Sequence, residues 1–86
     1  MTRPVYGHKY AQAFVEEDKR YTALYSYSTC VIYIDEDGWM KVYGLYSLTT
    51  RKHIGWFMKE LGLDYYLAKS CYLNDKQYNI YTGEMK

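Results

Sequence analysis

The spacing of the apolar residues changes at Ser47, and this change limits the possible folds more than any other feature. From Tyr21 to Tyr46 the chain is dense in Tyr, Val and Ile at intervals of two, which is typical of β-strands. After Ser47 the apolar residues recur at intervals of three and four, which is typical of an amphipathic helix. We therefore predict an α+β fold, in which an antiparallel β-meander packs against one helix at about residues 49–61.

Two interruptions divide the β-prone region into strands. The run Ser26-Tyr27-Ser28 predicts a bend or bulge between strands near 21–25 and 29–34, because serine side chains can bond to the local backbone. The run Asp35–Gly38 predicts a hairpin loop, because Gly38 can adopt a positive φ. The return strand is expected at Trp39–Tyr46.

Alternation along these two strands predicts which side chains share a face. We expect one strand to place Cys30, Ile32 and Ile34 on a single face. Met40 and Val42 supply the matching face of the return strand.

The helix has a predicted start, apolar stripe and end. Thr49 is the expected N-cap. The stripe has the spacing i, i+3, i+4, i+7 and consists of Ile54, Phe57, Met58 and Leu61. Gly62 then stands where a left-handed C-cap is expected, and Leu63 follows it as in a Schellman ending.

The remaining segments are less regular. Residues 1–9 are expected to form a loose N-terminal arm, and Tyr10–Val15 fits a strand or a helix. Residues 64–73 fit a short second helix or a strand, and a helix capped by Asp64 is favoured. A last strand is expected at about residues 77–82.

Length and composition suit a single domain spanning residues 1–86. Apolar residues make up 49% and charged residues 24% of the chain, which is enough apolar material for a core. The formal net charge of +1 gives no overall attraction to nucleic acid or to anionic membranes. We expect a cytoplasmic protein, because no apolar run approaches a membrane span and Met1–Pro4 begins no apolar signal segment.

No motif predicts catalysis, a metal or a cofactor. The four potential metal ligands His8, Cys30, His53 and Cys71 stand singly, whereas zinc sites show paired spacing. The favoured interpretation is that both cysteines are free and behave as small apolar residues, and a disulfide between them is the alternative. A nucleophilic arrangement of either cysteine with His53 and Asp64 can be drawn, but nothing in the spacing favours it. We expect a protein that is not an enzyme.

The start of the helix is the candidate site for an anion or a partner. Arg51, Lys52 and His53 crowd its first turn, although positive charge there opposes the helix dipole at a cost of about 0.3–1 kcal/mol. Free N–H groups and the hydroxyls of Thr49 and Thr50 would assist anion binding. The alternative is that these long side chains simply extend into water.

Aromatic residues suggest a second kind of contact. Trp56 lies off the helix stripe, so it either packs under another element, such as residues 64–73, or is exposed as a binding anchor. The chain has 13 tyrosines, and tyrosine is favoured both in half-buried strands and in binding surfaces. The sequence leaves both alternatives open.

Two stretches in the middle of the chain resemble known proteins. Leu24–Thr29 contains Tyr-Ser-Tyr, and Tyr46–Ile54 contains Tyr-Ser-Leu-Thr-Thr-Arg-Lys-His. Both are similar to a group of small, uncharacterised bacteriophage-encoded proteins, in which the first motif forms a strand and the second opens a helix. The resemblance covers roughly residues 22–57. It implies a phage or prophage gene product in the cytoplasm of a bacterial host, and it implies no catalytic role.

Two functions fit these observations. The first is a small phage or prophage accessory protein that binds a host or phage protein stoichiometrically, for example as an inhibitor of a host or defence protein. The alternative is a nucleic-acid-binding module, in which tyrosines on a sheet face stack bases while Lys41, Arg51 and Lys52 meet phosphates. Neither requires a membrane, and a homodimer is compatible with both.

Overall fold

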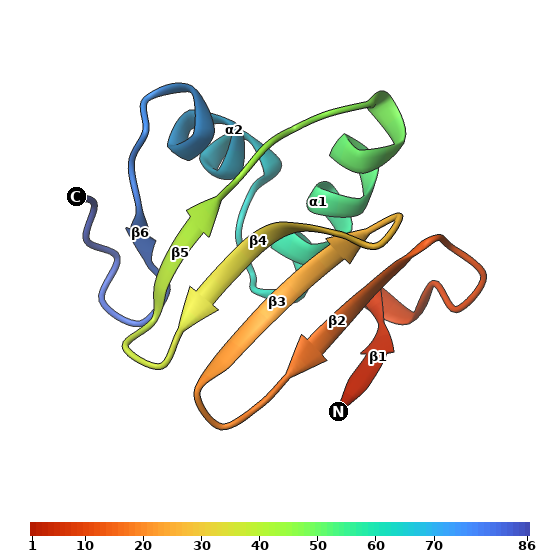
Figure 1. Ribbon diagram of the computed structural model, residues 1–86. Coiled ribbons are helices and arrows are strands. Elements are labelled where there is room, and N and C mark those ends of the chain that lie inside the picture. The colour runs from red at the N-terminus through yellow and green to blue at the C-terminus, as the bar shows by residue number, and fades with distance from the viewer.

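The computed structural model describes all residues from 1 to 86. A six-stranded antiparallel sheet has two helices on one face, so the predicted α+β class is confirmed. The elements in chain order are β1 (Thr2–Pro4), a 3₁₀ turn (Val5–Gly7), β2 (Ala13–Glu17), β3 (Tyr21–Ser26), β4 (Thr29–Asp35), β5 (Trp39–Val42), α1 (Leu48–Glu60), α2 (Tyr65–Leu73) and β6 (Tyr78–Asn79). Each strand pairs with the next, so the sheet is a simple meander (Figure 1).

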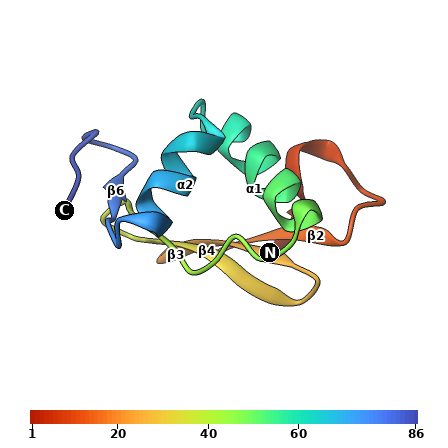
Figure 2. The same cartoon turned by 90° about the horizontal axis from the view of Figure 1, so that it is seen from above.

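The two helices cover only one side of the sheet. Seen from above, α1 and α2 lie together on the same side, and no element covers the other side (Figure 2). We call the side toward the helices the inner face and the opposite side the outer face. The outer face is turned toward the viewer in Figure 1.

The core lies between the inner face and α1. A row of paired residues crosses four strands on this face and consists of Val15, Leu24, Ile32 and Val42. From the helix, Ile54, Phe57 and Met58 are fully buried in the same cluster, and Leu61 packs against its edge. The predicted helix stripe is therefore confirmed, because these spacings place the four side chains on the side of α1 that covers the sheet.

The helix ends as predicted but begins earlier. The N-cap is Ser47 rather than Thr49: its backbone is extended, and its Oγ accepts the Thr50 N–H at 3.2 Å. Thr49 lies inside the first turn and is exposed. At the other end Gly62 has φ +72°, and the Leu63 N–H donates to the Met58 carbonyl at 2.8 Å, as in a Schellman ending.

The β3–β4 connection is a tight reversal rather than a bend. Tyr27 and Ser28 both have positive φ, 51° and 71°, as the two central residues of a type I′ hairpin turn do. The predicted strand break is thus confirmed, and the turn is sharper than expected. The hairpin loop before β5 also forms, with φ +93° at Gly38.

A register shift in β4 corrects one predicted face. Leu24 pairs with Ile32 but Tyr25 pairs with Cys30, so Val31 is an extra residue in β4. The shift turns Cys30 to the outer face, because a one-residue offset reverses side-chain direction. The other predicted assignments hold: Ile32 pairs with Val42, and Ile34 with Met40, on the inner face.

The predicted loose N-terminal arm is wrong. β1 pairs with β2 at the sheet edge, and Val5 is completely buried in the core. The Arg3 guanidinium bonds both Glu17 on β2 and Glu60 on α1. Contacts between residues so far apart in the chain give no local pattern, which explains why the sequence did not predict this strand.

The C-terminal part follows the favoured predictions. The Asp64 carboxylate accepts the Tyr66 N–H at 2.6 Å and starts α2, so residues 64–73 are helical. Ala68 and Cys71 face the core. β6 covers only Tyr78–Asn79, which is shorter than the strand expected at 77–82. Neither helix has the length and apolar character needed to cross a bilayer.

Candidate functional site

The first turns of α1 are joined to the sheet by a group of buried polar side chains. We call the buried residues Ser26, Thr50 and His53, together with the exposed N-cap Ser47, the polar cluster. Ser26 Oγ, on the inner face of β3, lies 3.1 Å from Thr50 Oγ1 and 2.8 Å from His53 Nδ1. The Ser47 hydroxyl donates to Thr50 Oγ1 at 3.3 Å. Ser26 therefore bonds across to the helix, and not to its local backbone as the sequence suggested.

Burial determines the chemistry of this cluster. Burial lowers the pKa of His53, and the positive charge of Lys52 lowers it further, so the imidazole is neutral near pH 7. A serine beside a histidine can act as a nucleophile. Here, however, both side chains are only 2% exposed. The cluster therefore serves to fasten α1 to β3.

Next to this cluster, aromatic rings form a continuous row across three elements. We call the row, Tyr6, His8, Trp56, His53 and Tyr27, the aromatic strip. The His8 ring stacks on the Trp56 indole with centroids 3.6 Å apart and an angle of 8°. Successive neighbours along the rest of the row are separated by 5.6–6.2 Å. The strip thus links the loop after β1, helix α1 and the β3–β4 turn.

Cations lie along the aromatic strip without carboxylate partners. Lys52 Nζ is 5.2 Å from the centre of the Trp56 ring, and Lys9 Nζ is 5.4 Å from that of Tyr10. Arg51 is exposed, and both ion pairs of the protein belong to Arg3. Beside the strip is an open hollow of about 420 Å³, lined by Gly7, His8, Lys9, Tyr10, Ala11 and Trp56.

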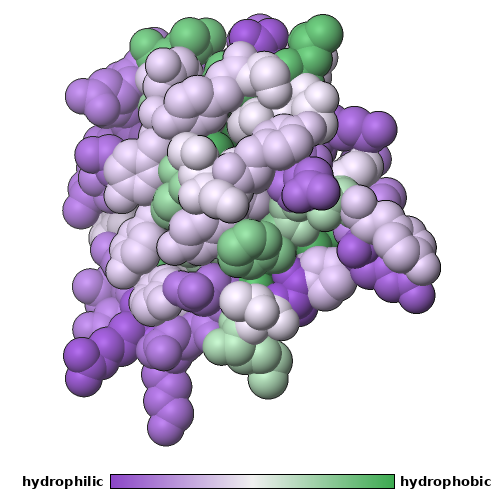
Figure 3. Space-filling view, turned by 45° about the vertical axis from the view of Figure 1, so that its right-hand side comes forward, coloured by the Kyte–Doolittle hydropathy of each residue, from purple (hydrophilic) through white to green (hydrophobic).

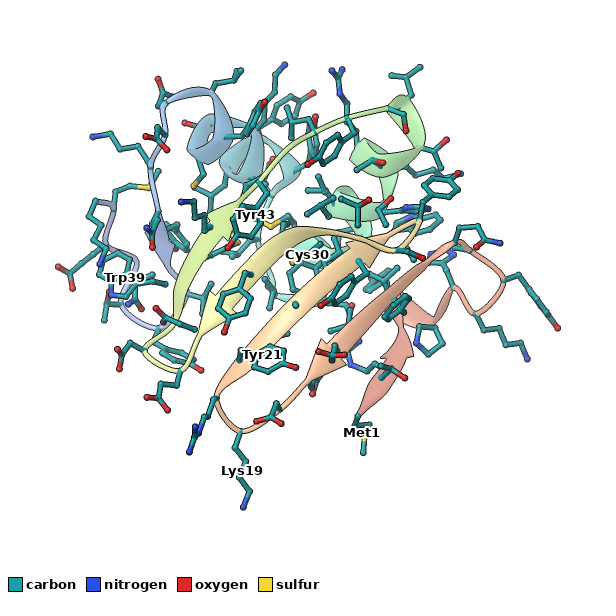
Figure 4. All side chains as sticks on the ribbon, viewed as in Figure 1. Met1, Lys19, Tyr21, Cys30, Trp39 and Tyr43 are labelled. Carbon is teal, nitrogen blue, oxygen red and sulfur yellow. The ribbon has the colours of Figure 1, made fainter.

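The outer face of the sheet is a second aromatic surface. Strand pairing and alternation place five large rings on it: Phe14, Tyr21, Tyr25, Tyr33 and Trp39. A sixth ring, Tyr43, follows β5 on the same side. Among the labelled side chains, Tyr21, Cys30 and Tyr43 lie in front of the strands in the view onto this face (Figure 4). Cross-strand stacking joins Phe14 to Tyr25 at 5.1 Å and Tyr21 to Tyr33 at 5.4 Å.

One carboxylate lies among these rings. The Tyr21 hydroxyl donates to Glu16, which raises the pKa of Tyr21 to about 12. The pKa of Tyr25 is raised by burial first and then by the Glu16 charge. Burial, and then Glu16, also raises the pKa of the Cys30 thiol. The outer face therefore keeps neutral phenols and a neutral thiol at physiological pH, and this thiol is a poor nucleophile.

Most of the chain matches a known protein family. Residues 3–76 match a family of unknown function, DUF8033. The chain belongs to this family. No curated protein and no solved structure matches it. The matched region extends from β1 to the turn after α2 and therefore contains the polar cluster, the aromatic strip and five of the six strands.

The six residues proposed from the sequence as a binding site fall into two groups in this DUF8033 chain, exposed and buried. Arg51, Lys52 and Thr49 are exposed on α1, and Trp56 is half-buried with its ring stacked against His8. Thr50 and His53 are buried in the polar cluster. Contrary to the prediction, they are therefore not available to a ligand. The six residues do not form a single surface.

Three residues of the aromatic strip were not predicted from the sequence, because their positions depend on contacts between distant parts of the chain. His8, Tyr6 and Tyr27 belong to the aromatic strip, yet each stands far from α1 in the chain. The β3–β4 turn could have indicated Tyr27, because a turn lifts its central side chains out of the sheet. No local pattern indicates His8.

The candidate metal ligands do not meet. Nowhere do three His, Cys, Asp or Glu side chains come close enough together to hold a metal ion. Cys30 is half-buried on the outer face, Cys71 is buried on α2, and both are free thiols. His53 is bonded to Ser26, and His8 is stacked on Trp56.

Proposed function

We propose that this protein binds another protein stoichiometrically through the outer face of its sheet. Following the phage resemblance, we propose that it is a phage or prophage accessory protein, that it acts in the cytoplasm of a bacterial host, and that its partner is a host or phage protein whose activity it alters. The main support is the outer face itself, which presents six aromatic rings and is covered by neither helix.

The composition of this face is that of a binding surface. Aromatic residues are enriched in the centres of protein interfaces, where they bury much area and lose little side-chain freedom. The stacked pairs Phe14–Tyr25 and Tyr21–Tyr33 are held in place before any partner arrives. A surface arranged in advance spends less binding energy on ordering its side chains.

Charge near this face indicates the kind of partner. Asp35, Glu36 and Asp37 form the turn at one end of the face, and Glu16 lies within it. Its rings also accept cations: Lys86 Nζ lies 4.1 Å from the Trp39 ring centre, and Lys41 Nζ lies 5.7 Å from that of Tyr43. We therefore expect a protein surface with an apolar centre and an arginine or lysine that faces this end.

Affinity capture with a matched pair of variants tests the proposal. The double variant Tyr33→Thr/Tyr43→Thr loses two outer-face rings. Threonine, like tyrosine, is favoured in β-strands, so the sheet should still form. In the control, Tyr66→Thr/Tyr72→Thr, two exposed tyrosines are removed from α2 instead. Each variant and the unaltered protein would be immobilised and exposed to bacterial lysate, and captured proteins would be identified by mass spectrometry.

We expect one protein to be captured by the unaltered chain and by the α2 control, but not by the outer-face variant. The purified pair should then form a complex of fixed stoichiometry in sedimentation experiments. The proposal fails if the outer-face variant captures the same proteins as the control. It also fails if the protein is a stable homodimer whose subunits bury this face against each other.

A further inference from the structure

Basic side chains outnumber acidic ones along one edge of the molecule. Three segments meet there through the aromatic strip: residues 5–12, the β3–β4 turn at 27–28, and residues 47–55 at the start of α1. They contain one arginine, two lysines and both histidines of the chain, and no aspartate or glutamate. The net charge of the whole chain is only +1 because the carboxylates in its other segments balance the basic residues of this edge.

The nearby carboxylate of Glu60 does not cancel this charge. It already accepts a hydrogen bond from the Tyr6 N–H at 3.0 Å and is paired with Arg3. Lys9, Arg51 and Lys52 have no such partner. These three cations therefore remain available to an anionic ligand.

The same edge offers ring faces on which flat groups can stack. Tyr6 and Tyr27 are 51% and 54% exposed, and both have left-handed backbones, with φ 48° and 51°. Such conformations disfavour residues with a side chain and are concentrated at functional positions. Figure 3 brings this edge forward while the outer face remains in view; pale side chains gather across the middle of the two surfaces together, and strongly hydrophilic ones lie mostly toward the rim.

The hollow beside the strip brings stacking and charge together. Its lining includes the Trp56 and His8 rings, the Tyr10 side chain and Lys9. Its volume of about 420 Å³ lies within the range of small-ligand sites, roughly 300–1,000 Å³. Gly7 has φ +75°, and there is open space where a Cβ atom would lie. This wall of the hollow is therefore free of side-chain atoms.

We propose that this edge binds single-stranded nucleic acid. A base enters the hollow and stacks on the rings of the strip, and the neighbouring phosphates meet Lys9, Lys52 and Arg51. A single strand is required because the base faces of a duplex are covered by stacking. This site differs from the one expected from the sequence, because Arg51 and Lys52 lie on the helix side of the sheet, opposite the tyrosines of the outer face.

Fluorescence anisotropy of a labelled short oligothymidine measures this binding directly. At about 50 mM salt, where electrostatic affinity is greatest, we expect saturable micromolar binding. Two or three phosphate contacts predict a slope of log affinity against log salt of about −1.5 to −2. In Trp39→Phe, Trp56 is the only remaining tryptophan, and its emission should be quenched as the oligonucleotide binds.

Paired variants separate the proposed site from general charge. Arg51→Gln/Lys52→Gln should weaken binding by roughly tenfold and flatten the salt slope. The control Lys19→Gln/Lys76→Gln removes the same charge from exposed positions elsewhere and should change affinity by less than about twofold. Trp56→Leu should weaken binding by roughly tenfold, because each stacked base contributes strongly.

Four results would overturn the proposal: no binding at about 50 mM salt, equal loss in both charge variants, equal affinity for a duplex, or equal affinity for polyglutamate. The last would assign the edge to an acidic protein surface. The proposal does not depend on the function proposed above. The outer-face variant Tyr33→Thr/Tyr43→Thr should bind the oligonucleotide normally, so either proposal can fail while the other stands.

Discussion

Replacing Ser26 with alanine tests how α1 is fastened to the sheet. The Ser26 hydroxyl is 2% exposed and contacts two partners on the helix, Thr50 Oγ1 at 3.1 Å and His53 Nδ1 at 2.8 Å. Alanine removes this hydroxyl and changes little else. The substitution therefore isolates the polar link between β3 and the helix that positions Trp56 and Lys52.

The expected cost follows from what each partner loses. Thr50 Oγ1 keeps its hydrogen bond from Ser47, but His53 Nδ1 is left without a protein partner. A buried polar group without a partner costs about 1–3 kcal/mol, so we expect the variant to lose about 2 kcal/mol. For a chain of 86 residues this is a large share of the total stability of roughly 4–13 kcal/mol.

Urea unfolding monitored by circular dichroism measures this loss. With a urea slope of about 1 kcal/mol per molar, the midpoint should fall by about 2 M. The control is Ser70→Ala on α2, where the hydroxyl is partly exposed, and it should change stability by less than about 0.5 kcal/mol. In a double-mutant cycle, Ser26→Ala combined with His53→Leu should cost less than the sum of the two single changes.

The reasoning is refuted if Ser26→Ala costs no more than Ser70→Ala. Strict additivity in the double-mutant cycle would also refute it. Either result would mean that packing alone holds α1 to β3.

Three further predictions concern charge and backbone strain. Because burial lowers the pKa of His53, the folded protein binds that proton less readily than the unfolded chain; the urea midpoint should fall as the pH drops below about 6.5, and a midpoint unchanged down to about pH 5.5 would contradict this. Replacing Glu16 with glutamine should bring the pKa of Tyr21 from about 12 down toward 10, as followed by NMR titration of labelled tyrosine, and an unchanged titration would contradict the assigned contact. The double change Tyr27→Asn/Ser28→Gly should raise the free energy of unfolding by about 1–2 kcal/mol and weaken oligonucleotide binding; if stability rises while binding is unchanged, Tyr27 is not part of the site.

Much of the fold could be predicted because its determinants are local. The stripe of α1, its Gly62 ending, the Asp64 cap and the hairpin at Gly38 depend on residues within a few positions of one another. The N-cap was misassigned by two positions because Ser47, Thr49 and Thr50 all have hydroxyls suited to capping, and only backbone geometry distinguishes them.

What could not be predicted depends on distant contacts. β1 is held by pairing with β2 and by the Arg3 bridge to Glu60, 57 positions away. Cys30 changes face because of one extra residue in β4, and alternation alone cannot locate such a bulge. His8 reaches Trp56 only after the N-terminal segment has folded back over α1. The aromatic strip was therefore hidden from sequence patterns, although the basic start of α1 was visible.

The strained backbone of the β3–β4 turn favours a functional role for the aromatic strip over a purely structural one. A two-residue turn of this geometry forms most easily with Asn-Gly, yet the chain has Tyr27-Ser28 with φ 51° and 71°. Tyr6 shows the same unfavourable choice at the other end of the strip. A side chain there costs stability without filling the core, since both tyrosines are more than half exposed. Two of the five non-glycine residues with positive φ, Tyr6 and Tyr27, lie at the two ends of one row of rings. We infer that the strain at these two positions is maintained for the surface that the rings form together.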